Sequence, residues 1–269
     1  MKIKAILCDY DGTLVDFNGE YGPEVPLLIK RLQDKGIQFG VATGRAFSGD
    51  VAATITKLDV SPLIIVNGGS MVLNWKTGDT PIFRPISNQS VFDCSEYLKK
   101  SNIVFSLESK DQIYMCEIID TPAYPDKSLI QLFTLENLPS DVLKILVHGF
   151  ANKLSEPIVN KHIKNIQSFC KDVEVMKFHF KQYYGIDITS EQSTKHTAVL
   201  AYSKLLGVSP HEIVAIGDGP NDYPLFTACG YKIAMGNAPS ELKEIADIVV
   251  SPAHQGGMTQ ALEHIFAIL

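Results

Sequence analysis

The most constraining feature of the sequence is a short, mostly apolar run at residues 3–8 that ends at two closely spaced aspartates. A run of this length, bounded by polar residues, predicts a strand buried on both faces, as in the middle of a parallel sheet. Asp9, Asp11 and Gly12 disfavour continuation of the strand, so the chain turns at its carboxyl end. Open α/β sheets bind their ligands at this edge.

Two carboxylates this close together repel each other unless a cation or a proton lies between them. A divalent cation with oxygen ligands, such as Mg²⁺, suits the pair, and an aspartate can also act as a nucleophile that forms an acyl-phosphate. An ordinary Asp-Gly turn with a capping aspartate explains the same residues. This stretch alone does not distinguish a reactive site from a turn.

Length and composition narrow the class of protein. The chain has 269 residues, which is enough for one large α/β domain or for two domains of ordinary size. Hydrophobic residues make up 45% and charged residues 20%, so a globular protein with a substantial core is expected. The net charge of −6, without a basic stripe, argues against nucleic acid as a main partner.

The cysteines and the first apolar run indicate where in the cell the protein is expected. The five cysteines form no C-x-x-C pair, which indicates reduced thiols rather than disulfides or a zinc site. The first apolar run is too short for a signal peptide or a membrane span. We therefore expect a cytoplasmic protein without a membrane partner. Its oligomeric state stays open, and a monomer is compatible with the sequence.

Strand and helix signals alternate in the first part of the chain. The expected strands are 3–8, 37–42 and 63–66, and the expected helices are 23–34 and 46–58. This alternation predicts a parallel sheet. The same alternation resumes with a helix expected over 195–206 and continues to residue 269.

Between these stretches the pattern changes to short alternating strands separated by helical segments. The clearest helices in this middle part are expected over 89–100 and 157–170. An α+β composition between two α/β stretches indicates an insertion. We therefore predict a core domain formed by residues 1–80 and 188–269, and an inserted cap domain formed by residues 81–187.

Four separated segments place polar groups at the carboxyl end of an expected strand or at the start of an expected helix. They are Asp9 with Asp11, Thr43 with Gly44 and Arg45, Lys195 alone, and Asp218 with Asn221 and Asp222. Lys195 stands out on physical grounds, because the helix dipole disfavours a cation at a helix start by about 0.3–1 kcal/mol. An anion that binds there would offset this cost.

This ordered set resembles the haloacid-dehalogenase-like (HAD) phosphohydrolases, and most of all the Cof-type subgroup, whose cap domain is inserted after the second motif. The motifs are D-x-D-G-T at 9–13, T-G-R at 43–45, the isolated Lys195, and G-D-G-x-N-D at 217–222. Each motif alone is a weak signal, but the four in this order are specific. The resemblance implies a Rossmann-like parallel-sheet core with an inserted α+β cap.

The resemblance also implies a Mg²⁺-dependent phosphatase that works through an aspartyl-phosphate. Asp9 would attack the phosphorus, and Asp11 would act as general acid and then as general base. Mg²⁺ would be held by Asp9, the main-chain carbonyl of Asp11 and Asp218. Asp222 would bind the ion directly or through water.

The implied phosphate-binding residues are Thr43, Gly44 and Lys195, which would contact the equatorial oxygens of the phosphoryl group. Arg45 would either contact the substrate or cap its own loop. Asn221 would orient the neighbouring aspartate or approach the phosphate.

The expected substrate is a small phosphorylated metabolite, with a sugar phosphate as the best candidate. Haloacid dehalogenase chemistry does not fit, because Asp11 serves to protonate a leaving group that such a reaction lacks. A phosphomutase of the same superfamily would carry the same motifs, so it stays an alternative. A regulatory or binding protein on this fold is the alternative from another class.

Overall fold

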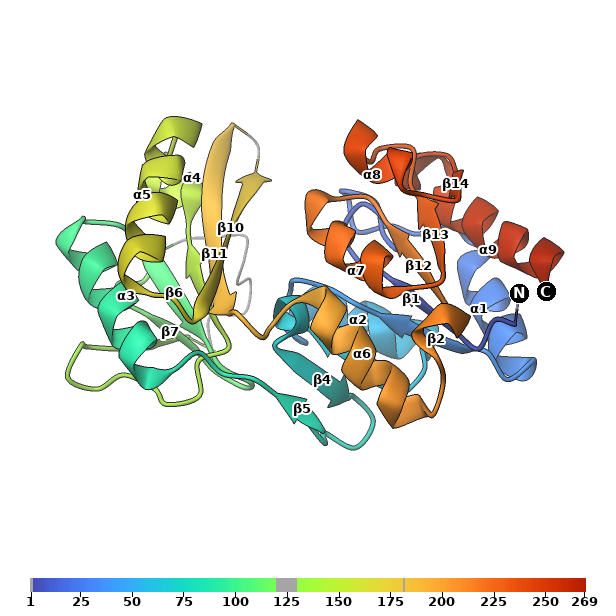
Figure 1. Cartoon of the computed structure of the whole chain (residues 1–269), viewed down its shortest axis with the longest axis horizontal. Helices are drawn as coiled ribbons and strands as arrows, with labels where there is room; N and C mark the ends of the chain where they lie inside the picture. The colour runs from blue at the N-terminus through green and yellow to red at the C-terminus, as the bar shows by residue number, and fades with distance from the viewer. Residues whose placement is uncertain (1, 120–129, 181) are drawn as a thin grey trace. The chain divides into compact units, whose positions relative to one another are not determined.

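The computed structural model describes residues 2–119, 130–180 and 182–269. The chain divides into two units (Figure 1). The core unit consists of Met1–Ile82 and Thr194–Leu269, and the inserted unit consists of Phe83–Ser193. The function of the inserted unit as a cap stays a prediction.

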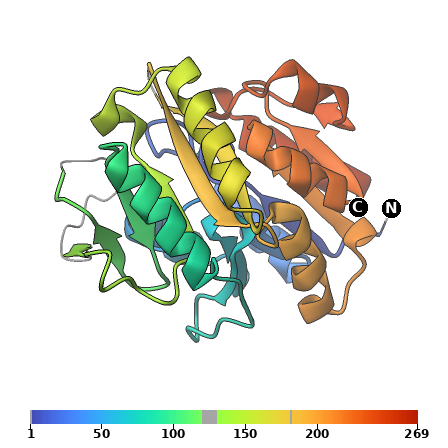
Figure 2. The ribbon, with the colours of Figure 1, turned by 60° about the vertical axis from the view of Figure 1, so that its left-hand side comes forward.

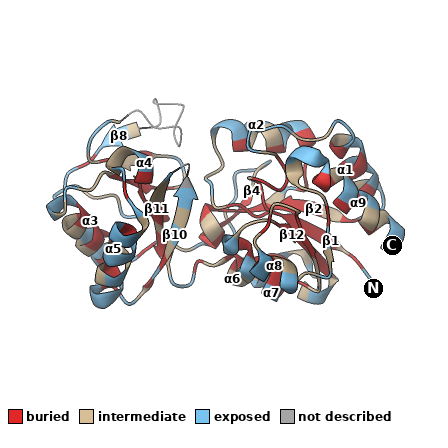
Figure 3. Ribbon diagram, turned by 90° about the horizontal axis from the view of Figure 1, so that it is seen from above, coloured by how far each residue is buried: buried red, intermediate tan, exposed pale blue. Residues whose placement is uncertain are grey.

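The core unit is organised around a five-stranded sheet with the order β14-β13-β12-β1-β2, in which every neighbouring pair is parallel. Its strands are β1 (Ala5–Cys8), β2 (Gln38–Val41), β12 (Ile213–Gly217), β13 (Tyr231–Ala234) and β14 (Ile248–Val249). All four residues of β1 are buried, as its apolar sequence predicts, and the middle of the sheet is buried in Figure 3. The predicted α/β class is confirmed.

Helices connect and cover these strands. They are α1 (Val25–Asp34), α2 (Gly49–Leu58), α6 (Lys195–Leu206), α7 (Tyr223–Ala228), α8 (Ser240–Glu244) and α9 (Gly257–Ile268). Ala5 and Leu7 of β1 share an apolar cluster with residues of α6 and α7. Helix α1 packs against β2 and α9. Across the described ranges, no helix combines the length and the apolar character needed to cross a membrane.

One predicted strand joins a different sheet. Residues 63–66 form β3 (Leu63–Val66), which pairs antiparallel with β4 (Met71–Asn74) in a three-stranded sheet that β5 (Ile82–Phe83) completes. On its other side β3 runs parallel to the end of β2, through a bridge between Ala42 and Ile65 and a hydrogen bond from the Thr43 N–H to the Ile65 carbonyl oxygen at 2.9 Å, as the strand–helix alternation predicts. The turn Asn67–Gly69 sends the chain directly back into the antiparallel β4, whereas α2 is the crossover between β2 and β3.

The inserted unit contains a six-stranded sheet with the order β10-β11-β9-β6-β7-β8. Its strands are β6 (Phe105–Glu108), β7 (Ile113–Met115), β8 (Ile130–Leu132), β9 (Lys144–Val147), β10 (Val173–Phe180) and β11 (Tyr183–Ser190). The predicted middle helices form as α3 (Asn88–Lys100) and α5 (Glu156–Phe169), and a short helix α4 (Gly149–Asn152) follows β9.

Helices α3 and α5 lie side by side on one face of this sheet (Figure 2). Alternate strand residues point toward them and form one apolar cluster with the helices, namely Phe105, Leu107, Ile145, Val147, Ile186 and Ile188. Because side chains alternate along a strand, the intervening residues lie on the opposite face.

The segments that enter and leave the inserted unit are hydrogen-bonded to each other. Arg84 Nη1 donates to the carbonyl oxygen of Gln192 at 3.2 Å. Ser193 Oγ donates to the carbonyl oxygen of Arg84, also at 3.2 Å, across 109 positions of sequence. The entry and exit of the insertion therefore lie side by side.

The turn after β3 packs against the start of α6. Gly69 has a φ of +108°, and a Cβ added there would collide with the carbonyl group of Thr194. Thr194 is the N-cap of α6, and its hydroxyl accepts a hydrogen bond from the Thr197 N–H at 3.1 Å. This close approach, which only glycine allows, fixes where Lys195 begins the helix.

We expect Gly69→Ala to lower the free energy of unfolding by about 2–4 kcal/mol, because it adds a backbone collision to an unfavourable φ. Gly68→Ala is the matched control, since Gly68 has a φ of +70° but open space where a Cβ would lie. Urea unfolding followed by circular dichroism measures both variants. Equal losses would show that the contact with Thr194 does not matter.

Candidate functional site

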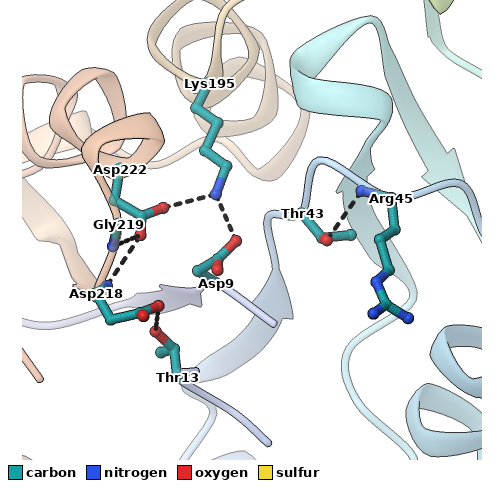
Figure 4. A network of polar contacts seen from close by, with 8 residues as sticks. All are labelled: Asp9, Thr13, Thr43, Arg45, Lys195, Asp218, Gly219 and Asp222. Atoms are coloured by element: carbon teal, nitrogen blue, oxygen red, sulfur yellow. Dashed lines mark hydrogen bonds and ion pairs between the residues drawn. The ribbon is translucent and has the colours of Figure 1, made fainter. Parts of the chain in front are cut away.

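The site residues come from separate segments of the core unit and meet at the carboxyl edge of its parallel sheet (Figure 4). Asp9 directly follows β1, and its N–H still donates to Ile216 of the neighbouring strand at 2.9 Å. Asp218 directly follows β12, and Thr43 lies two residues after β2. Lys195 is the first residue of α6. The sequence predicted this convergence, because parallel strands place their carboxyl ends at one edge.

A buried lysine joins two of the aspartates. Lys195 Nζ lies 2.5 Å from Asp9 Oδ1 and 2.6 Å from Asp222 Oδ1. The side chains of Lys195 and Asp222 are 3% and 0% exposed. Charges this deeply buried are tolerated only when they are paired and hydrogen-bonded.

Asp222 also holds the loop that follows β12. Its second oxygen, Oδ2, accepts hydrogen bonds from the N–H groups of Asp218 and Gly219, both at 2.9 Å. The same carboxylate therefore orients the lysine with one oxygen and the Asp218 loop with the other. Donors already engage both oxygens, which favours a positioning role for Asp222 over direct binding of an ion.

Asp218 is fixed by two side chains. Thr13 Oγ1 donates to Asp218 Oδ1 at 2.7 Å, and Asn237 Nδ2 donates to Asp218 Oδ2 at 2.8 Å. Asn237 also donates to the carbonyl oxygen of Gly12 at 3.0 Å. The sequence analysis gave Thr13 no role, although it is the last residue of the first motif. Its position in that motif could have indicated a contact within the site.

The buried Asp9 and Asp222 and the half-buried Asp218 form a cluster of oxygen ligands. One carboxylate oxygen each from Asp9, Asp218 and Asp222 lies within 4.8 Å of the others. Three carboxylates against the one ammonium of Lys195 leave two negative charges in excess. Oxygen-only ligands with this excess fit a hard divalent cation.

Ionisation in this cluster is strongly perturbed. Burial raises the pKa of Asp9 well above its ordinary value, the charge of Asp222 adds to this effect, and Lys195 opposes it. Burial also raises the pKa of Asp218, to about 6. Burial lowers the pKa of Lys195, but the charges of Asp222 and Asp9 outweigh it and raise that pKa above its ordinary value. A bound cation would favour the ionised carboxylates.

Asp11 lies at the more exposed side of the site, where it pairs with Arg45. Arg45 Nη2 is 2.8 Å from Asp11 Oδ1, and the two side chains are 52% and 44% exposed. The Arg45 N–H donates a hydrogen bond to Thr43 Oγ1 at 3.1 Å. This bond stabilises the turn formed by the second motif, residues 43–45. The structure thus brings Asp11, Thr43 and Arg45 together.

The other two predicted residues lie nearby. Gly44 directly follows the buried Thr43, and open space surrounds the position where a Cβ would lie. Asn221 is exposed in the short turn Pro220–Asp222, next to Asp222. Their contacts with a phosphate stay predictions.

Comparison with known proteins relates this site to a family. A family model described as haloacid dehalogenase-like hydrolase matches residues 6–262. The chain is 26% identical to a 5-amino-6-(5-phospho-D-ribitylamino)uracil phosphatase of Bacillus subtilis over 98% of this chain and 99% of that protein. It is 22% identical to a phosphoglycolate phosphatase of Methanothermobacter thermautotrophicus over 97% of each.

Solved structures show the same fold. A haloacid dehalogenase-like hydrolase from B. subtilis superposes with a TM-score of 0.82, at 22% identity, over 97% of this chain and 99% of that one. Both units of the chain therefore have counterparts in known proteins.

When a chelator keeps divalent cations away from the site, we expect the free energy of unfolding to fall as the pH rises from about 4 to 6. The pKa of Asp218 is about 6 in the folded chain and ordinarily 3.8. Between these values the folded chain holds a proton on Asp218 that the unfolded chain has released, so rising pH favours unfolding, and this group contributes about 3 kcal/mol. Urea unfolding at several pH values measures this slope.

Asp218→Asn should reduce the slope between pH 4 and 6, and a saturating divalent cation, which keeps the carboxylate ionised in the folded chain, should remove it. Asp34→Asn is the matched control, because it removes the same charge from an exposed side chain on α1. An unchanged slope in Asp218→Asn would contradict the assignment.

Proposed function

The chain belongs to the haloacid dehalogenase-like hydrolase family, and we propose that it is a Mg²⁺-dependent phosphatase that cleaves a small phosphorylated metabolite through an aspartyl-phosphate. The family resemblance predicted from the four motifs is confirmed by the match over residues 6–262. The chain is therefore an enzyme. The observation that carries the proposal is the buried Lys195 between Asp9 and Asp222, with Asp218 beside them.

Asp9 is the proposed nucleophile. Its carboxylate attacks the phosphorus, the bond to the leaving oxygen breaks, and an aspartyl-phosphate forms. Lys195 holds one Asp9 oxygen at 2.5 Å and thereby orients the carboxylate. The same ammonium group, together with Thr43 and the Gly44 N–H, binds the phosphoryl oxygens where negative charge accumulates.

Asp11 is the proposed proton donor and acceptor. It gives a proton to the leaving oxygen in the first step and takes one from water in the second, when that water attacks phosphorus and releases Asp9. In the structure the Asp11 carboxylate pairs with Arg45. A dianionic phosphate offers Arg45 an alternative partner, so we propose that Arg45 turns to the substrate when it binds.

Asp9, Asp218 and the main-chain carbonyl of Asp11 are the residues that we propose hold Mg²⁺. When bound, the ion neutralises the charge between nucleophile and phosphate. The oxygen-only ligands and the two excess negative charges of the cluster support this choice. We propose that Asp222 acts through Asp218 and Lys195, whose positions it fixes.

The substrate we propose is a sugar phosphate or a related phosphate ester. Both named relatives act on small phosphorylated molecules, one of them with a ribityl chain. We also propose that the inserted unit is the cap domain that selects this substrate. A cytoplasmic location is supported by the five cysteines, all of which are free thiols.

We expect Asp9→Asn to abolish phosphate release and to leave the fold intact, because the side chains are isosteric and the site is polar. A phosphate-release assay with p-nitrophenyl phosphate and Mg²⁺ measures turnover, and circular dichroism checks folding. Asp34→Asn, on the surface of α1, should keep wild-type turnover. Near wild-type release by Asp9→Asn would remove Asp9 from the nucleophile role.

Asp11→Asn should retain the main-chain carbonyl for the ion but lose proton transfer, on the order of 10²–10⁴ in rate. The loss should be smaller for p-nitrophenyl phosphate, whose leaving group needs little protonation, than for an alkyl phosphate. Equal losses with both substrates would count against Asp11 as the acid. Product analysis with a hexose 1-phosphate separates a phosphatase, which yields free phosphate, from a mutase, which yields the 6-phosphate.

A further inference from the structure

Two buried cysteines of the inserted unit are in direct contact. Cys94 lies within α3, and Cys170 directly follows Phe169, the last residue of α5. Their sulfur atoms are 3.5 Å apart, although 76 positions of sequence separate the two residues. Both side chains belong to the apolar cluster that the helices form with the sheet, where Cys94 is 0% and Cys170 3% exposed. The fold thus brings two free thiols together inside one unit.

A second contact joins the same two segments. Ser90 lies one helical turn before Cys94 on α3, and its hydroxyl donates a hydrogen bond to Asp172 Oδ1 at 2.5 Å. Asp172 lies two residues after Cys170. Because residues four positions apart share one face of a helix, the hydrogen bond and the thiol contact both join α3 to the end of α5. The two contacts together hold the sulfur atoms near each other, whereas packing of two small apolar side chains would not require their sulfurs to meet.

A disulfide requires only a small shift of these atoms. Bonded sulfur atoms lie about 2.0 Å apart, so the two sulfurs must approach by about 1.5 Å from their distance of 3.5 Å. Cys170 is the C-cap of α5 and has an extended backbone, so it is not held inside the helix. Its neighbours Phe169 and Lys171 are exposed. Because a helix end opens locally at a lower cost in free energy than a core does, a small reagent can reach Cys170.

The two thiols differ in how readily they ionise. Burial raises the pKa of both cysteines. At Cys170, hydrogen bonds from Ser90 and Cys94 stabilise the thiolate and oppose this rise in pKa, whereas at Cys94 the contact with Cys170 adds to it. The thiolate is the form of cysteine that attacks a disulfide. Cys170 is therefore the better placed of the two to attack first.

We propose that Cys94 and Cys170 form a reversible disulfide by exchange with a low-molecular-weight disulfide, such as oxidised glutathione. The Cys170 thiolate attacks one glutathione sulfur, the bond between the two glutathione sulfurs breaks, and one glutathione thiolate leaves. The Cys94 thiolate then attacks the Cys170 sulfur and releases the second glutathione. The two protein thiols lose two electrons and two protons in all, which convert oxidised glutathione into two glutathione thiols. An excess of reduced glutathione drives the same steps backward.

The bond acts on the stability of the inserted unit. It closes a loop from residue 94 to residue 170, which restricts the unfolded chain and needs only a small change in the folded one. Both cysteines lie in the inserted unit, and the loop contains no residue of the Lys195 cluster. Oxidation therefore stabilises this unit, and reduction releases it.

The test maps the thiols of the wild-type protein. Reduced, folded protein is incubated with mixtures of reduced and oxidised glutathione, the remaining free thiols are blocked with N-ethylmaleimide, and unreduced peptides are analysed by mass spectrometry. The expected result is a peptide pair that joins Cys94 to Cys170 and is lost on treatment with dithiothreitol. Cys116→Ser is the matched control and should keep this link, because the Cys116 thiol lies in the same unit but contacts the Phe105 carbonyl oxygen, at 3.6 Å.

Thermal unfolding followed by circular dichroism measures the effect on stability. The oxidised wild type should unfold at a temperature about 5–10 °C above that of the reduced wild type. Cys116→Ser should show the same rise on oxidation. Cys170→Ala cannot form the link and should show no rise.

Three results would overturn the inference. Cys94 and Cys170 could stay unlinked in the folded wild type at every glutathione ratio, the link could form only in urea, or it could form without a rise in the unfolding temperature. Each result is read from the wild-type protein, so none depends on how the variants fold.

Discussion

The arrangement at the carboxyl edge of the core sheet depends on one buried ammonium group. Lys195 compensates two carboxylates that are almost completely buried, at 2.5 and 2.6 Å. Removal of one partner from such a cluster leaves an uncompensated charge and costs about 3–5 kcal/mol. The position of this lysine follows from the N-cap at Thr194 and from the close approach of Gly69, which set the first turn of α6.

Because Lys195 is fixed, the carboxylates around it are fixed as well. Asp222 uses one oxygen for the lysine and the other for the two N–H groups after β12, so the lysine and the Asp218 loop share one anchor. Thr13 and Asn237 hold Asp218 from the other side. The cluster is thus preorganised while it still carries excess negative charge, as a site for a cation requires.

The sequence predicted the parts of this site that depend on local chemistry. Apolar runs indicated the strands, and polar residues after them indicated the edge where they meet. The position of Lys195 at a helix start was predictable, because Thr194 is an ordinary N-cap residue. The double role of Asp222 was not, since it depends on donors brought to it by the fold.

The pairing and register of the strands depend on tertiary contacts and could not be predicted from local sequence patterns. Residues 63–66 have the composition of a strand in a parallel sheet and meet the end of β2 in parallel, but the turn at Asn67–Gly69 also pairs them antiparallel with β4. The ion pairs that Lys144 of β9 makes with Glu108 of β6 and Asp187 of β11 depend on the register between these three strands. That register could not be read from single strands, in which Glu108 and Lys144 look like ordinary surface charges.

The hydrogen bonds between Arg84 and residues 192–193 have a consequence for how the chain folds. Asp9 and Lys195 are 186 positions apart, so their contact closes a long loop, which is entropically costly in an unfolded chain. An inserted unit that folds first brings its own two ends together and shortens the effective loop. Closure of the core would then be made easier by the folding of a segment that contributes no residue to the Lys195 cluster.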